Sequence, residues 1–145
     1  MRRFLAFLFL CTVIFVVLPE KAIGQCKGFA KRICRAELGK YTHDGNYHAA
    51  VLTEGEEAEL YKTFYPGQDY RIAICGTEVL SGIEFEVMDN QHNVLYTNRD
   101  NDYKRIWDFR LESTQQLVIS VRVLPAGQGE EPASGCVAIL FGMTQ

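Results

Sequence analysis

The chain has 145 residues, and 15 lysines and arginines stand against 18 aspartates and glutamates, which gives a formal net charge of −3. This mildly acidic balance argues against a nucleic-acid partner, because nucleic-acid binding needs clustered positive charge. The length suits one globular domain and is too short for two domains of ordinary size.

The first 24 residues predict a secretory signal peptide. Arg2 and Arg3 form a positive start, and an uninterrupted apolar run follows from Phe4 to Leu18. Small residues follow that run, so we expect cleavage after Gly24. A retained membrane anchor is the alternative, but the apolar run is about 15 residues long, short of the roughly 20 that a spanning helix needs.

A lipoprotein signal is a second alternative, because Cys26 lies close to the cleavage site. However, Gln25 precedes this cysteine, where lipoprotein signals carry Gly, Ala or Ser. Removal of residues 1–24 leaves 12 basic and 17 acidic residues and a net charge of about −5. We therefore expect a secreted or periplasmic protein, with a single domain over residues 25–145.

Four cysteines remain in the mature chain, and an even number in an exported protein predicts two disulfide bonds. These residues are Cys26, Cys34, Cys75 and Cys136. A structural zinc site is the alternative. No pair has the short spacing of a zinc knuckle and no histidine lies at a complementary spacing, so we expect no metal here.

Residues 26–38 predict an amphipathic helix, because apolar residues recur on one helical stripe. Residues eight apart in a helix are separated by about 12 Å along its axis, whereas the Cα atoms of a disulfide lie about 4.4–6.8 Å apart. If the helix forms, Cys26 and Cys34 must each pair with Cys75 or Cys136. If the segment is a loop, Cys26–Cys34 and Cys75–Cys136 become the expected pairs. The stripe consists of Cys26, Phe29, Ala30, Ile33 and Cys34.

The remaining chain predicts about eight short β-strands. In the clearest of them, Ile83, Phe85 and Val87 alternate with two glutamates, the pattern of a sheet with one dry and one wet face. The last segment is largely apolar, which suits a central strand covered on both sides. Short strands separated by turns predict an antiparallel β-sandwich or jelly roll. The expected strands span 47–53, 58–65, 68–75, 83–88, 94–97, 104–111, 116–124 and 135–142.

The order of these segments resembles the pre-peptidase C-terminal type of β-sandwich, in which a Gly…Tyr-x-Ile strand leads to a Phe-x-Val-x-Asp strand. The resemblance implies this fold and an accessory role, since those domains have no catalytic residues to carry over. This chain departs from the family in having no attached peptidase and an added helix with two cysteines. It is also similar to small stand-alone exported proteins of Gram-negative bacteria. The resemblance covers roughly Val51 to Phe141 and rests on Leu60, Phe64, Pro66-Gly67, Tyr70-Arg71-Ile72, Ile83 to Asp89, Trp107-x-Phe109 and Leu117-x-Ile119-x-Val121.

The sequence favours a non-catalytic binding or interaction module of the cell envelope or extracellular space, without a cofactor. It contains no nucleophile elbow, zinc-protease motif or phosphate-binding glycine loop. The partner would be a protein, glycan or lipid of the envelope. Exposed aromatic side chains would contact this partner, and the candidates are Tyr61, Tyr65 and Tyr103.

A small glycan or peptide hydrolase and a purely structural envelope protein remain as alternatives. The hydrolase predicts a concave pocket lined by Glu84, Glu86, Asp108 or a histidine with shifted titration. Asp100 and Asp102 are candidate calcium ligands, because calcium prefers clustered oxygen ligands. Their spacing does not match the EF-hand loop, and two basic residues follow directly.

Overall fold

The structure is a computed structural model that describes residues 20–144. The predicted positive start and apolar run of the signal peptide lie outside the described residues. Within residues 20–144 the chain forms the helix α2 (Glu20–Arg32), the short 3-10 helix η1 (Cys34–Leu38) and nine β-strands. No helix in this range is long and apolar enough to cross a membrane.

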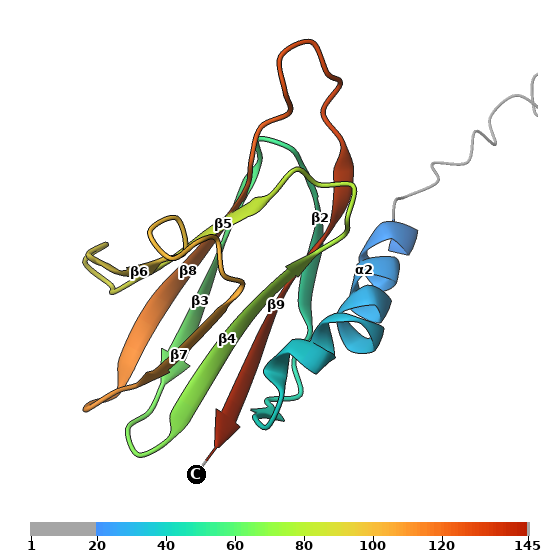
Figure 1. The fold of residues 1–145 in the computed structure, drawn as a ribbon. Helices are drawn as coiled ribbons and strands as arrows, with labels where there is room; N and C mark the ends of the chain where they lie inside the picture. Colours follow the sequence, from blue (N-terminus) through green and yellow to red (C-terminus); the bar gives the residue numbers. More distant parts are fainter. Residues whose placement is uncertain (1–19, 145) are drawn as a thin grey trace, which may run out of the picture.

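The nine strands form two antiparallel sheets that pack face to face (Figure 1). In sheet A, β9 is central, with β4 and then β7 on one side and both β1 and β2 on the other. In sheet B the order is β3-β8-β5-β6. Sheet A consists of β1 (Thr42–His43), β2 (His48–Thr53), β4 (Asp69–Gly76), β7 (Ile106–Arg110) and β9 (Ser134–Thr144). Sheet B consists of β3 (Glu57–Phe64), β5 (Ile83–Met88), β6 (Val94–Thr97) and β8 (Gln115–Val123).

This arrangement confirms the predicted mainly β, antiparallel sandwich with one N-terminal helix. The central position of β9 also agrees with its predicted burial on both faces. The strand count is nine instead of about eight, because the two-residue strand β1 pairs with the end of β9 at Met143 and Gly142. Two residues carry too little periodicity to mark a strand in the sequence.

The main core lies between the sheets and is built from alternate residues of each strand. Ile83, Phe85 and Val87 of β5 point inward and are buried, as their alternation predicts. Trp107 and Phe109 of β7 are half-buried against this core.

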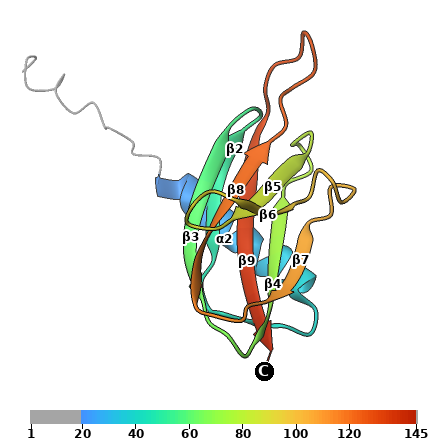
Figure 2. The same ribbon diagram turned by 90° about the vertical axis from the view of Figure 1, so that its left-hand side faces the viewer.

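A second, smaller core lies between the outer face of sheet A and the two helices (Figures 1 and 2). Disulfides tie α2 to β9 through Cys26–Cys136 and η1 to β4 through Cys34–Cys75. Their Cα separations are 5.2 and 5.7 Å. The pairing therefore follows the helical alternative. The buried members of this second core are Ala30, Cys34, Leu38, Ala73, Cys75, Ala138 and Leu140.

The helix expected over residues 26–38 is divided in the structure. The α-helix ends at Arg32 and the chain continues as the 3-10 helix η1. Cys26, Ala30 and Cys34 are buried as the apolar stripe predicts, but Ile33 is 60% exposed. The tighter 3-10 turn changes the angular spacing of side chains and turns Ile33 away from sheet A. Cleavage after Gly24 stays a prediction.

Candidate functional site

The outer face of sheet B carries charged side chains in a cross-strand pattern. Arg122 of β8 lies opposite Glu57 of β3 on one side and Glu84 of β5 on the other. One step along β8, Ser120 lies between Glu59 and Glu86 in the same way. Opposite charges on neighbouring strands attract, so the register itself organises this face.

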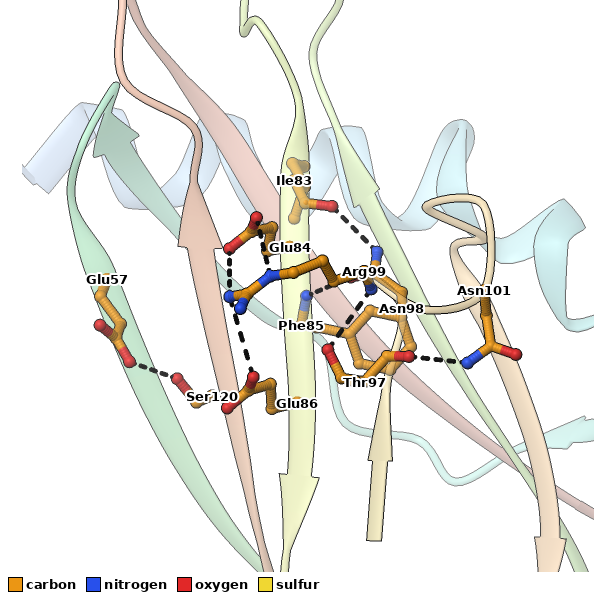
Figure 3. Close-up of polar contacts among 10 residues, drawn as sticks. All are labelled: Glu57, Ile83, Glu84, Phe85, Glu86, Thr97, Asn98, Arg99, Asn101 and Ser120. Atoms are coloured by element: carbon orange, nitrogen blue, oxygen red, sulfur yellow. Dashed lines mark hydrogen bonds and ion pairs between the residues drawn. The ribbon is translucent and has the colours of Figure 1, made fainter. Parts of the chain in front are cut away.

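Five of these residues, together with Arg99, surround a polar pocket of about 140 Å³, which we call the outer pocket. Arg99, from the loop after β6, reaches across Glu84 toward Glu86 (Figure 3). Its Nη2 lies 3.1 Å from Glu84 Oε2 and 3.9 Å from Glu86 Oε1. On the far side, Ser120 Oγ donates a hydrogen bond of 2.5 Å to Glu57 Oε1. The pocket is lined by Glu57, Glu84, Phe85, Glu86, Arg99, Ser120 and Arg122.

The ion pair of Arg99 is partly shielded from water on the Glu84 side. The side chain of Glu84 is only 11% exposed, whereas that of Arg99 is 54% exposed. The hydrogen bonds to Glu84 raise the pKa of the Arg99 guanidinium, which therefore stays charged. The arrangement is a pair of opposite charges whose arginine end is open to solvent.

Asn98 holds the base of the loop that carries Arg99. Its side chain is completely buried and clamps β5: Oδ1 accepts from the Phe85 amide at 2.9 Å, and Nδ2 donates to the Ile83 carbonyl at 3.0 Å (Figure 3). The Asn98 amide also donates to the Phe85 carbonyl. Sequence reasoning missed Asn98, because an asparagine at the head of a polar run is usually a solvated turn residue.

The three predicted contact tyrosines come from different elements. Tyr61 lies on the outer face of sheet B, is 54% exposed and donates to Glu59 Oε2 at 3.2 Å. The Glu59 carboxylate raises the pKa of the Tyr61 hydroxyl. Tyr65 lies in the turn after β3, and Tyr103 lies in the loop between β6 and β7. Within residues 20–144, no ring–ring contact joins any two of these tyrosines.

The hydrolase candidates are divided between opposite faces of the molecule. Glu84 and Glu86 share the outer pocket of sheet B. Asp108 lies on the outer face of sheet A, where both its oxygens accept from Arg71 at 2.7 and 2.8 Å. His48 lies on β2, at another edge. The structure therefore brings Glu84 and Glu86 together at one pocket and places Asp108 and His48 away from it.

The loop after β6 closes on its own backbone. Asn101 and Tyr103 both donate to the Asn98 carbonyl, and Asp102 and Tyr103 adopt left-handed φ angles. In the described part of the chain, no group of three or more His, Cys, Asp or Glu residues could hold a metal ion. The calcium interpretation of Asp100 and Asp102 therefore has no ligand set to support it.

Fold and surface together define a small β-sandwich with a disulfide-tethered helix on one sheet and a face without a covering helix, within residues 20–144, on the other. No protein-family model matches the chain, and no curated protein matches it. Among solved structures, it is similar to PliG of Aeromonas hydrophila, described as a periplasmic lysozyme inhibitor of g-type lysozyme. The TM-score is 0.52 at 14% identity, over 72% of this chain and 89% of that chain.

This likeness concerns the fold, because the identity is low. The similar protein is described as a periplasmic inhibitor. The two disulfides fit the same oxidising, exported environment. None of the comparisons bears on the resemblance to pre-peptidase C-terminal domains, which stays a prediction.

Proposed function

We propose that this chain is a non-catalytic exported module that binds a protein partner through the outer face of sheet B. The observation that carries the proposal is the difference between the two outer faces. Sheet A is covered by α2 and η1, whereas no helix of residues 20–144 lies over sheet B (Figure 2). The open face carries a preformed set of ion pairs, which lowers the ordering cost of binding.

The charges of this face favour a basic partner. It presents four carboxylates against two guanidinium groups, an excess of negative charge that attracts a positive surface. Tyr61 and Arg99 are both about half exposed and belong to residue types that dominate binding energy at interfaces. The carboxylates are Glu57, Glu59, Glu84 and Glu86, and the guanidinium groups are those of Arg99 and Arg122.

The likeness to PliG supports a lysozyme as the first partner to test, with the periplasm or the extracellular space as the place of action. Inhibition would follow from occlusion of the enzyme and would need no chemistry from this chain. A predicted signal peptide and two disulfides support the same compartment.

The test measures binding of the oxidised protein to a panel of lysozymes, including a g-type enzyme, by calorimetry, together with cell-wall lysis. We expect saturable binding that weakens with salt, and Tyr61→Ala should weaken it about tenfold or more. Tyr65→Ala is the matched control, because this tyrosine is 58% exposed but lies beyond the end of β3. Absence of binding to every lysozyme would remove the lysozyme assignment. Equal losses of affinity in Tyr61→Ala and Tyr65→Ala would rule out the outer face of sheet B as the binding surface.

A further inference from the structure

The two open sides of the sandwich are filled differently. On the side of β6 and β7, aromatic rings close the gap between the sheets: Tyr96 stacks on Trp107 at 5.0 Å, and Trp107 stacks on Phe109 at 4.4 Å. On the side of β2 and β3, the inward positions include Ala50 and Ala58, whose methyl groups cannot span the roughly 10 Å between packed sheets.

The small side chains leave an edge cavity of about 350 Å³ between β2 and β3. Its volume falls in the range of small-molecule sites, about 300–1,000 Å³. At roughly 30 Å³ for each water-sized group, the edge cavity has room for about a dozen such groups. The walls are apolar and reach the main core at Leu52, Leu60, Val121, Val137 and Ile139.

Both ends of the edge cavity are limited by specific contacts. Near His48, Lys62 crosses from β3 to Asp44, with Nζ 2.7 Å from Oδ2 and 4.6 Å from the centre of the Phe141 ring. At the other end the chain turns from β2 into β3, where the Gly55 amide donates to the Val123 carbonyl and the Val123 amide donates to the Glu56 carbonyl. The cavity is thus a slot with an open long side.

The polar side chains at the mouth of the slot include those of Lys27, His48 and Glu59, and Lys27 is the cation among them. The exposed Lys27 of α2 lines this mouth, and His48 lies in the opposing fields of the Asp44 carboxylate on one hand and of Lys62 and Lys27 on the other. Burial lowers the pKa of His48, so at neutral pH its ring is an uncharged hydrogen-bonding group. Glu59 lies at the rim, but its carboxylate accepts the hydroxyl of Tyr61 on the outer face of sheet B.

We propose that the edge cavity binds a free, single-chain anionic amphiphile, with an alkyl tail of roughly ten to twelve carbons in the slot and its headgroup at Lys27. The apolar walls supply the driving force for the tail, and the ammonium group selects the charge of the head. This site is separate from the outer pocket and does not depend on the proposed protein partner.

The test is calorimetric titration with dodecanoate below its micelle concentration, with dodecanol as the neutral comparison. We expect one saturable site in the wild type. Ala50→Phe fills the slot and should weaken binding at least tenfold. Val51→Phe, one position away on the outer side of β2, should leave binding within about twofold. Lys27→Gln should weaken the binding of dodecanoate several-fold and leave the affinity for dodecanol unchanged.

Ala58→Leu provides a second block from β3, in case Ala50→Phe fails to fold, as judged by its thermal unfolding transition. Absence of saturable dodecanoate binding, or equal affinity of Ala50→Phe and Val51→Phe, would overturn the proposal. An equal effect of Lys27→Gln on both compounds would overturn the role of the headgroup. Binding to phosphatidylglycerol vesicles without binding to dodecanoate would overturn the assignment to a free amphiphile.

Discussion

The two outer faces of the sandwich differ in what holds them. On sheet A, apolar residues such as Ala73 and Leu140 are buried under α2 and η1, and two disulfides fix this cover. On sheet B, five of the outward strand positions carry charged side chains, and the ion pairs of Arg99 with Glu84 and Glu86 lie on this surface. One face is therefore part of the folded core, whereas the other is organised but remains available.

This difference separates stability from recognition. Apolar burial contributes about 25 cal/mol for each Å² removed from water, while exposed ion pairs contribute about 0–1 kcal/mol. Substitutions on the covered face should therefore change the free energy of unfolding. Substitutions of exposed groups on the open face should mainly change binding.

The largest expected effect is loss of the disulfides. Replacing Cys26 and Cys136 by alanine opens a loop with a sequence separation of 110 residues, and replacing Cys34 and Cys75 opens one of 41. Each pair should cost about 2–5 kcal/mol of unfolding free energy, with the longer loop toward the upper end. Denaturant unfolding of the two double variants measures this. Unchanged stability would mean that the two disulfides do not hold α2 and η1 on sheet A.

The next effect compares one residue from each face. Leu140→Ala removes a fully buried side chain beneath the helices and should cost about 2–5 kcal/mol. Tyr61→Ala removes an exposed side chain and should change stability by no more than about 0.5 kcal/mol. Chemical denaturation of both variants checks the contrast. Similar losses would show that the open face also carries the fold.

A smaller but specific effect concerns the clamp under Arg99. Asn98→Ala leaves the Phe85 amide and the Ile83 carbonyl without their side-chain partner and should cost about 1–3 kcal/mol. It should also weaken partner binding by freeing the Arg99 loop. Asn101→Ala, which removes one exposed hydrogen bond to Thr97, is the control and should cost less. Equal losses of unfolding free energy in Asn98→Ala and Asn101→Ala would contradict the role of Asn98 as the support of the Arg99 loop.

The smallest effect is a pH dependence on the covered face. The hydrogen bonds from Arg71 lower the pKa of Asp108 below its usual 3.8. A carboxyl group whose pKa is lower in the folded state than in the unfolded state stabilises the fold. This stabilisation is fully present above the unfolded-state pKa and is lost as the pH falls through the folded-state pKa. Asp108→Asn should therefore destabilise slightly at pH 7 and flatten the loss of stability below about pH 4.

Asp100→Asn, in the exposed loop after β6, is the control for this pH dependence. Unfolding of both variants between about pH 7 and pH 2 measures the difference. Because the Asp108 side chain is 43% exposed, added salt should reduce the effect. An identical acid profile for Asp108→Asn and the parent protein would contradict the assigned role of the Arg71 pair.

The sequence predicted the layers better than the surfaces that they form. Alternating Ile83, Glu84 and Phe85 predicted a strand with one wet face, and β5 and β6 have the predicted bounds. The helical spacing of Cys26 and Cys34 predicted that they would not pair with each other if the helix formed, and the structure has the pairs Cys26–Cys136 and Cys34–Cys75. These features depend on local periodicity, which a sequence displays directly.

Other features depend on residues far apart in the chain. The end of α2 at Arg32 accompanies the packing of η1 against β4 and β9, which no local signal announces. The meeting of Glu57, Glu84 and Arg99 in the outer pocket requires the β3-β8-β5 order. Asn98 is a buried clamp only because β6 ends beside β5.

The most direct test of the open face is side-chain NMR on the isotope-labelled protein with and without a bound lysozyme. The account predicts chemical-shift changes centred on Tyr61, Glu84 and Arg99, with little change along α2. Changes concentrated on α2 and η1, with the outer face of sheet B unaffected, would contradict it.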